Sequence, residues 1–217
     1  MSLAIFDLDS TLIAGDSDHS WGEYLIEQNI VDADSFRKAN DRFFDDYKAG
    51  ILDMEAYVSF ALAPLREMSR ETRDKLHREF MDQKIAPLML PKAQSLIQKH
   101  KDQGDVLLII TATNRFITEP IAQLLGIDNL IATDPELVDD RFTGRIIGIP
   151  SFQDGKVTRL EQWVEQHQEE MAGSFFYSDS FNDIPLLERV SFPCAVDPDE
   201  KLRAHATNKQ WPSISLR

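Results

Sequence analysis

The chain has 217 residues, 42% of them hydrophobic, which is enough apolar material for one sizeable core. Its formal net charge of −14 repels nucleic-acid phosphates and anionic membrane surfaces, so we expect neither as a partner. A single cysteine, Cys194, excludes a disulfide within the chain, and no apolar run reaches the length of about 18 residues that a membrane span needs. No signal-peptide pattern is evident at the start, and we expect a cytoplasmic protein.

Four short apolar runs, each ending in polar or turn-forming residues, predict buried strands. These runs are residues 3–6, 106–110, 174–177 and 192–196. Helical spacing of apolar residues lies between them, over 91–100 and 157–164. Strands that alternate with helices predict an α/β fold, with a Rossmann-like parallel sheet covered by helices on both faces. Ligands of such sheets bind at the carboxyl ends of the strands.

Residues 15–87 interrupt this alternation and contain no convincing strand. Apolar residues fall there at helical spacing, with Asp53 and Ser69 as possible N-caps and Gly50 as a stop. We therefore expect an inserted helical cap domain over 15–87, joined by a linker at 15–19, and a catalytic core made of 1–14 and 88–217. A short hairpin is expected over 140–148, with residues 143–144 near its turn.

Side chains suited to phosphate or metal chemistry follow the predicted strands or start a predicted helix. Each has a structural alternative: a polar turn, an end-of-strand hydroxyl, a solvated lysine or a helix-capping acid. Their order and placement together favour one shared site at the carboxyl edge of the sheet. The residues are Asp7, Asp9, Thr111, Lys156, Asp179 and Asp183.

A phosphate monoester is a dianion that repels an approaching carboxylate, and a bridging Mg²⁺ removes much of that repulsion. Asp7 would then attack phosphorus and form an aspartyl-phosphate. Asp9 would protonate the leaving group and later deprotonate water, and Lys156 would offset the negative charge. The Thr111 hydroxyl and the Ala112 backbone N–H would donate to phosphate.

These four motifs, residues 7–11, Thr111, Lys156 and residues 179–183, resemble those of the haloacid dehalogenase (HAD) superfamily. The closest resemblance is to its phosphoserine phosphatase-like branch, subfamily IB, with a helical C1 cap. The resemblance covers essentially the whole chain. It implies that the side chains of Asp7 and Asp179 and the backbone carbonyl of Asp9 bind Mg²⁺, and that Asp183 orients metal-bound water.

Two further positions bear on the substrate that the resemblance implies. Asp16 matches the position of an acidic residue that reads the substrate amine in phosphoserine phosphatases, whereas Asp18 and His19 are interpreted as solvent-facing. Those enzymes usually show Ser-Gly-Gly after the second strand, and here residues 111–114 read Thr-Ala-Thr-Asn. The missing glycines are those that let a substrate carboxylate approach the backbone, so the resemblance favours histidinol phosphate, which has no carboxylate, over phosphoserine. Asn114 is a further candidate for substrate binding.

The resulting hypothesis is a Mg²⁺-dependent phosphomonoester hydrolase that acts on a small phosphorylated metabolite. Two alternatives remain at this point: a phosphoryl transferase or mutase on the same core, and a receiver-like signalling protein phosphorylated on aspartate. The sequence leaves the oligomeric state open.

Overall fold

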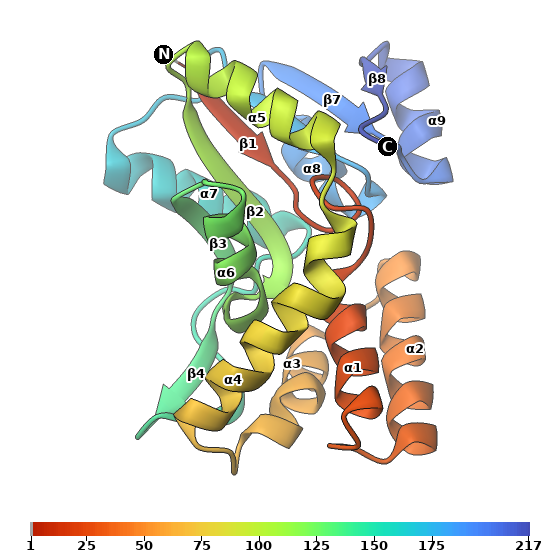
Figure 1. Ribbon diagram of the computed structural model, residues 1–217. Coiled ribbons are helices and arrows are strands. Elements are labelled where there is room, and N and C mark those ends of the chain that lie inside the picture. Colours follow the sequence, from red (N-terminus) through yellow and green to blue (C-terminus); the bar gives the residue numbers. More distant parts are fainter. Residues whose placement is uncertain (1) are drawn as a thin grey trace.

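The computed structural model describes residues 2–217 and contains a six-stranded, fully parallel sheet in the order β3-β2-β1-β6-β7-β8 (Figure 1). The strands of this sheet are β1 (Leu3–Phe6), β2 (Val106–Asn114), β3 (Asn129–Thr133), β6 (Phe175–Ser178), β7 (Phe192–Val196) and β8 (Ser213–Ile214). The α/β fold and the four predicted strands are confirmed, although β2 runs further than expected. Edge strands β3 and β8 were not predicted.

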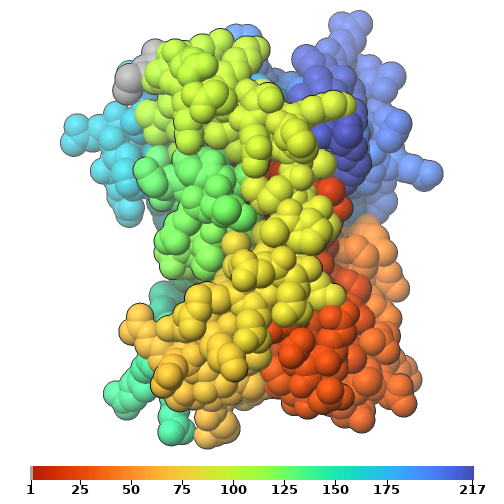
Figure 2. All heavy atoms as spheres, viewed as in Figure 1, coloured from red at the N-terminus to blue at the C-terminus, as the bar shows by residue number. Residues whose placement is uncertain are grey.

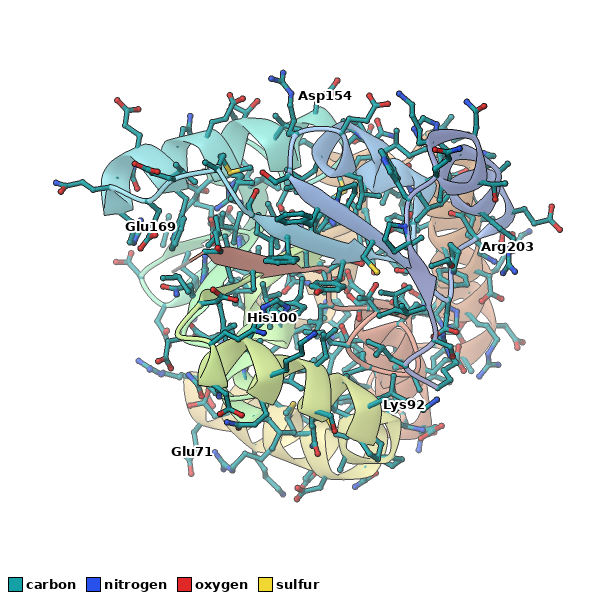
Figure 3. All side chains as sticks on the ribbon, turned by 90° about the horizontal axis from the view of Figure 1, so that it is seen from above. Glu71, Lys92, His100, Asp154, Glu169 and Arg203 are labelled. Atoms are coloured by element: carbon teal, nitrogen blue, oxygen red, sulfur yellow. The ribbon has the colours of Figure 1, made fainter. Side chains whose placement is uncertain are left out.

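Alternating side chains of the central strands divide the core into two layers. Ala4 and Phe6 point to one face, where α5 and α6 cover them, and Leu3 and Ile5 point to the other, where α7, α8 and α9 lie. Viewed from above, α5 and α7 flank the sheet on opposite sides, and His100 on α5 points inward toward the strands (Figure 3). The sheet is therefore covered on both faces, as the sequence predicts.

The helices include the expected insertion between β1 and β2. The α-helices are α1 (Ser17–Glu27), α2 (Ala33–Ala49), α3 (Met54–Leu62), α4 (Arg70–Phe80), α5 (Pro91–Asp102), α6 (Arg115–Leu124), α7 (Asp154–His167), α8 (Ile184–Leu187) and α9 (Glu200–Lys209). Asp53 and Ser69 cap α3 and α4 through their side chains, and Gly50 ends α2 at φ 80°, as expected. The linker expected over 15–19 is shorter, because Asp16 already caps α1. Across residues 2–217, no helix has the length and apolar character that crossing a membrane requires.

The inserted helices pack on the core to different extents. Trp21 of α1, Val58 of α3 and Phe80 of α4 belong to the same apolar cluster as Phe6 of β1. Helix α2 instead buries Phe43 in a small separate cluster with α3. In the space-filling view, the orange surface of α2 meets the blue C-terminal part of the core where the outline narrows (Figure 2). Helix α2 is thus the part of the cap with the least shared core.

A hairpin is present, but its turn is not where the sequence predicts it. Strands β4 (Pro135–Val138) and β5 (Arg141–Ile146) pair antiparallel, and the turn is made by Asp139 and Asp140 at φ 48° and 61°. The prediction of a turn at residues 143–144 is wrong. The turn falls at Asp139 and Asp140 because aspartates tolerate the left-handed conformation that tight hairpin turns require. The Arg73 guanidinium of α4 donates to the backbone oxygen of Asp140 (2.8 Å), which ties the hairpin to the inserted helices.

Candidate active site

Asp7 lies at the carboxyl end of the central strand β1, where its backbone N–H continues the ladder to the Tyr177 oxygen (2.9 Å). Its side chain is 5% exposed and accepts a hydrogen bond from Lys156 Nζ (2.9 Å). Lys156, in the first turn of α7, also contacts Asp183, with Nζ 2.7 Å from Oδ1. Two carboxylates from different segments thus share one buried cation.

Asp183 precedes the short helix α8, where the sequence allowed a capping role. Its side chain makes no capping hydrogen bond and instead accepts from Lys156 Nζ (2.9 Å) and Ser178 Oγ (2.7 Å). Helix α8 does begin after Asp183, with a proline in its first turn, but the carboxylate does not cap it. Neither Lys156 nor Asp183 lines the cavity described below, so both act on it from behind Asp7.

Asp9 is held in place from both sides. Its Oδ1 accepts from the Ser17 backbone N–H (2.6 Å), and its Oδ2 accepts from Thr113 Oγ1 (2.9 Å). Thr113 is not among the residues predicted from the sequence. The available signal was its spacing from Thr111, because residues two apart in an extended strand point to the same face and β2 continues through both.

Asp179 is held by Thr11, a member of the first motif to which the sequence analysis assigned no role. The Thr11 hydroxyl donates to Asp179 Oδ1 (2.9 Å) and accepts from the Asp179 backbone N–H (3.0 Å). This pair joins the loop after β1 to the loop after β6. The loops that carry Asp7 and Asp179 are therefore fixed to each other.

A cavity of about 400 Å³ lies between this edge of the sheet and the inserted helices. Asp7, Asp9 and Asp179 line it from the core, together with Thr111 and Ala112. Most of the candidates from the sequence therefore meet around one space.

Asn114 does not line the cavity. Its side-chain oxygen accepts from the Ile117 backbone N–H (3.3 Å) and caps α6. The structure thus places this predicted substrate-binding residue at a helix end, because the chain enters α6 directly after β2.

Burial and mutual repulsion raise the pKa values of the cavity carboxylates. For Asp7, burial raises the pKa to about 7, with Asp183 adding to the rise and Lys156 opposing it. For Asp9, burial and the charge of Asp16 raise the pKa to about 6, against the hydrogen bonds from Ser17 and Thr113. Burial, followed by the charge of Asp7, raises the pKa of Asp179 well above its ordinary value. The site concentrates negative charge that Lys156 offsets in part.

These donors suit a hard cation such as Mg²⁺, which binds oxygen ligands and retains several waters. Within residues 2–217, no three His, Cys, Asp or Glu side chains form a complete ligand set. Asp7 and Asp179 offer two carboxylates, and Mg²⁺ commonly needs only one or two from a protein, so the residues present fit this ion.

The cap contributes two acids to the same cavity. Asp16 lines it, while its Oδ1 accepts from the His19 backbone N–H (2.7 Å) as the N-cap of α1. Asp18 also lines it and is only 8% exposed, so its interpretation as solvent-facing is wrong. The first turn of α1 faces the core rather than solvent, which local sequence does not reveal. His19 lines the cavity and contacts Asp41 at 3.0 Å.

Comparison with known proteins agrees with this geometry. The family model of haloacid dehalogenase-like hydrolases matches residues 4–188, and the chain belongs to this family. The histidinol-phosphatase of Neisseria meningitidis serogroup C (strain 8013) is 46% identical over 100% of this chain and 99% of its own length. The phosphoserine phosphatase SerB1 of Mycobacterium tuberculosis is 31% identical over 99% of this chain and 70% of its own length.

Solved structures share the fold. A Bordetella pertussis Tohama I protein of unknown function superposes with a TM-score of 0.93 at 41% identity, covering 100% of this chain and 99% of its own. A phosphoserine phosphatase solved as a phospho-aspartyl intermediate analogue gives 0.71 at 16% identity, covering 100% and 93%. With its family and its phosphatase relatives, the protein is a HAD-type phosphatase.

Proposed function

We propose that the protein is a Mg²⁺-dependent histidinol-phosphate phosphatase that works through an aspartyl-phosphate on Asp7. The observation that carries the proposal is the arrangement around Asp7. Its carboxylate is buried at the end of β1, contacts Lys156 at 2.9 Å, and shares a cavity with Asp9, Thr111 and Asp179. A nucleophile, an acid–base group and donors for phosphate are thus available in one enclosed space.

Asp7 would attack phosphorus while Lys156 stabilises the negative charge of the reacting groups. The Thr111 hydroxyl and the Ala112 backbone N–H, both on the cavity wall, are candidates to bind the phosphoryl oxygens. Asp183 accepts hydrogen bonds from both Lys156 Nζ and Ser178 Oγ. The ammonium group of Lys156 is therefore oriented before substrate binds.

Asp9 is the proposed acid–base residue. Its pKa of about 6 allows both protonation states near neutral pH, so one carboxyl can protonate the leaving oxygen and then take a proton from water. The hydrogen bonds from Ser17 and Thr113 fix its orientation.

A Mg²⁺ ion held by Asp7, Asp179 and the backbone oxygen of Asp9 would supply neutralisation of the phosphate dianion as the carboxylate approaches. In the absence of that charge, the Asp7 carboxylate repels Asp179 and, after burial, raises the pKa of Asp179. Thr11 keeps Asp179 in position for this role.

The substrate proposal rests on the relative at 46% identity and full coverage, whose name is histidinol-phosphatase. The cavity supports it with aromatic side chains on its cap side, among them Phe43, Phe44 and Tyr57. Such walls accommodate a flat ring on the leaving alcohol.

The test is release of inorganic phosphate from histidinol phosphate, phosphoserine and para-nitrophenyl phosphate, with and without Mg²⁺. We expect histidinol phosphate to give the highest kcat/KM, and Asp7→Asn to abolish turnover while the protein stays folded by circular dichroism. Turnover that survives in Asp7→Asn would exclude this residue as the nucleophile. Transfer of the phosphoryl group to an added alcohol in preference to water would favour the transferase alternative, and a stable phospho-form the signalling one.

A further inference from the structure

The Asp18 carboxylate on the cap side of the cavity is buried without a full set of partners. The residue is 8% exposed and lines the cavity, and its Oδ1 has no hydrogen-bond partner within residues 2–217. A carboxylate in such a position is strongly destabilised unless a cation or a donor reaches it. The geometry therefore indicates a partner that enters the cavity.

Nearby negative charges further favour a cationic partner for Asp18. Asp9 and Asp16 line the same cavity, and after burial itself their charges raise the pKa of Asp18 well above its ordinary value, while the Tyr57 hydroxyl opposes the rise. A carboxylate surrounded in this way favours a positively charged ligand.

The cations on the cavity wall, and Lys156 behind it, are engaged elsewhere or lie on aromatic rings. Lys156 is bound to Asp7 and Asp183. Lys48 lies 4.0 Å above the Phe44 ring and pairs with Asp45, Lys201 lies 3.8 Å above Phe181, and His19 contacts Asp41. None of these groups has Asp18 as an ion-pair partner in the part of the chain that is described.

Asp16, the acid that the family resemblance singles out, is less buried than Asp18 and already serves as the N-cap of α1. Its Oδ1 accepts from the His19 backbone N–H at 2.7 Å in the helix cap. Asp18, whose buried Oδ1 has no hydrogen-bond partner within residues 2–217, lines a cavity whose wall also includes Phe43, Leu52 and Tyr57. An anionic acceptor beside apolar and aromatic surface suits an organic ammonium group attached to a flat or apolar body.

We propose that Asp18, with Tyr57 beside it, binds the ammonium group of the leaving alcohol and thereby selects phosphate monoesters of amino alcohols with an apolar or aromatic side chain. This inference rests on the proposed phosphatase function and deepens it by assigning a specificity residue. The phosphate would lie at Asp7 and the ammonium at Asp18, on opposite walls of one cavity.

Substrate pairs that differ only in the amine separate this role from a structural one. We expect Asp18→Asn to lower kcat/KM for histidinol phosphate about 50-fold, the size typical of a lost charged hydrogen bond. The deaminated analogue, 3-(imidazol-4-yl)propyl phosphate, should change less than about threefold, and the exposed cap variant Asp74→Asn should leave both rates unchanged. Equal losses on both substrates, or no loss on either, would overturn the proposal.

Binding of the dephosphorylated alcohols gives a readout that does not need turnover. By calorimetry, histidinol should bind the wild-type protein more tightly than its deaminated counterpart, and Asp18→Asn should remove that difference. If the wild type releases no phosphate from any ester, the proposed function fails, while the binding comparison still decides the role of Asp18. If phosphate is released but the amine adds nothing to binding in the wild type, the Asp18 proposal alone fails.

Discussion

Lys156 and Asp183 form an ion pair in which each side chain is only 1% exposed and Nζ lies 2.7 Å from Oδ1. The same ammonium donates to Asp7 at 2.9 Å, and the Ser178 hydroxyl donates to Asp183 at 2.7 Å. Burial of charged groups is tolerated only where each one is paired. Asp183 therefore holds Lys156 in the orientation that places its charge against Asp7.

Replacement of Lys156 should show how far the burial of the Asp7 and Asp183 carboxylates depends on its positive charge. We expect Lys156→Met to lower the free energy of unfolding by about 3–5 kcal/mol, because two buried carboxylates lose their cation. Burial raises the pKa of Asp7 and Lys156 opposes that rise, so the pKa should rise further in the variant. A raised carboxylate pKa gives stability that is present at low pH and lost as pH rises.

The measurement is urea unfolding of wild type and Lys156→Met at pH 4.5 and pH 8, with the exposed variant Lys75→Met as control. The deficit of Lys156→Met should be larger at pH 8 than at pH 4.5. An equal deficit at the two pH values would contradict the assignment of Asp7 and Asp183 as the groups that depend on Lys156.

Thr113 offers a test of how Asp9 is oriented. Thr113→Val keeps the shape of the side chain and removes the hydroxyl that donates to Asp9 Oδ2 at 2.9 Å. We expect kcat/KM to fall about tenfold, the effect of one hydrogen bond of ordinary strength. The hydrogen bond lowers the pKa of Asp9, so its loss should move the acidic limb of the kcat profile to higher pH. A matched control is Thr158→Val, which removes a hydroxyl of α7 that does not line the cavity. An unshifted acidic limb in Thr113→Val would argue that Thr113 supports the loop only.

Helix α2 is fastened to the core by side-chain amides. Asn182 Nδ2 donates to the Tyr47 oxygen (2.9 Å), and Gln153 Nε2 donates to the Gly50 oxygen (3.1 Å) and to Asn182 Oδ1 (3.0 Å). We define these contacts of Gln153 and Asn182 with residues 47–50 as the α2 latch. Because α2 shares little core with the sheet, the latch should decide how often this side of the cavity opens.

Asn182→Ala should therefore increase amide hydrogen exchange across α2 about tenfold, while exchange in α4, which packs in the main core, stays unchanged. It should also raise KM, because the closed cavity is populated less. Gln98→Ala on the exposed face of α5 is the control. Faster exchange spread evenly over α2 and α4 would show general destabilisation and not a latch.

The sequence predicts the parts of this fold that local pattern controls. The strands at 3–6 and 192–196 are apolar and end at polar residues, and the caps Asp53 and Ser69 are local signals. Strand β8 has only two residues and is defined by its pairing with β7, which no local pattern encodes. Strand β3 has five residues, one more than β1, so its length does not explain why the sequence pattern does not single it out. Helix α6 contains Pro120, which weakens its helical signal.

The candidate site follows the same division. The meeting of Asp7, Asp9 and Asp179 at one cavity can be predicted from the sequence, because each follows a strand and parallel strands end at the same edge. Asp18 is missed because its burial depends on how α1 lies against the core, over residues distant in sequence. Asn114 is misassigned because its place after β2 suits a phosphate loop as well as a helix cap.

Replacement of Asp179 should weaken Mg²⁺ binding strongly while the protein stays folded. We expect 5 mM Mg²⁺ to raise the thermal midpoint of the wild type, since a ligand that binds only the folded state stabilises it. Asp179→Asn should show a much smaller rise and at least a 100-fold lower kcat, in the order of magnitude seen when metal-site groups are removed. Ca²⁺ and K⁺ at the same ionic strength separate specific binding from screening. A full Mg²⁺ response in Asp179→Asn would place the ion elsewhere.

The Asp18 carboxylate should lower the free energy of unfolding of the wild type at neutral pH. This effect can be measured without any substrate. Burial, followed by the charges of Asp16 and Asp9, raises the pKa of Asp18 well above 3.8. Its carboxyl is neutral in the folded and the unfolded state below pH 3.8, so there Asp18→Asn should have little effect on the free energy of unfolding. As pH rises, the unfolded state ionises first, and the wild type loses stability that the variant retains. Asp18→Asn should therefore be more stable than the wild type at pH 8, by roughly 1–3 kcal/mol, while Asp74→Asn tracks the wild type at each pH. A pH-independent difference, or a variant that is less stable at pH 8, would mean that Asp18 has satisfied partners within the protein and does not await a cation.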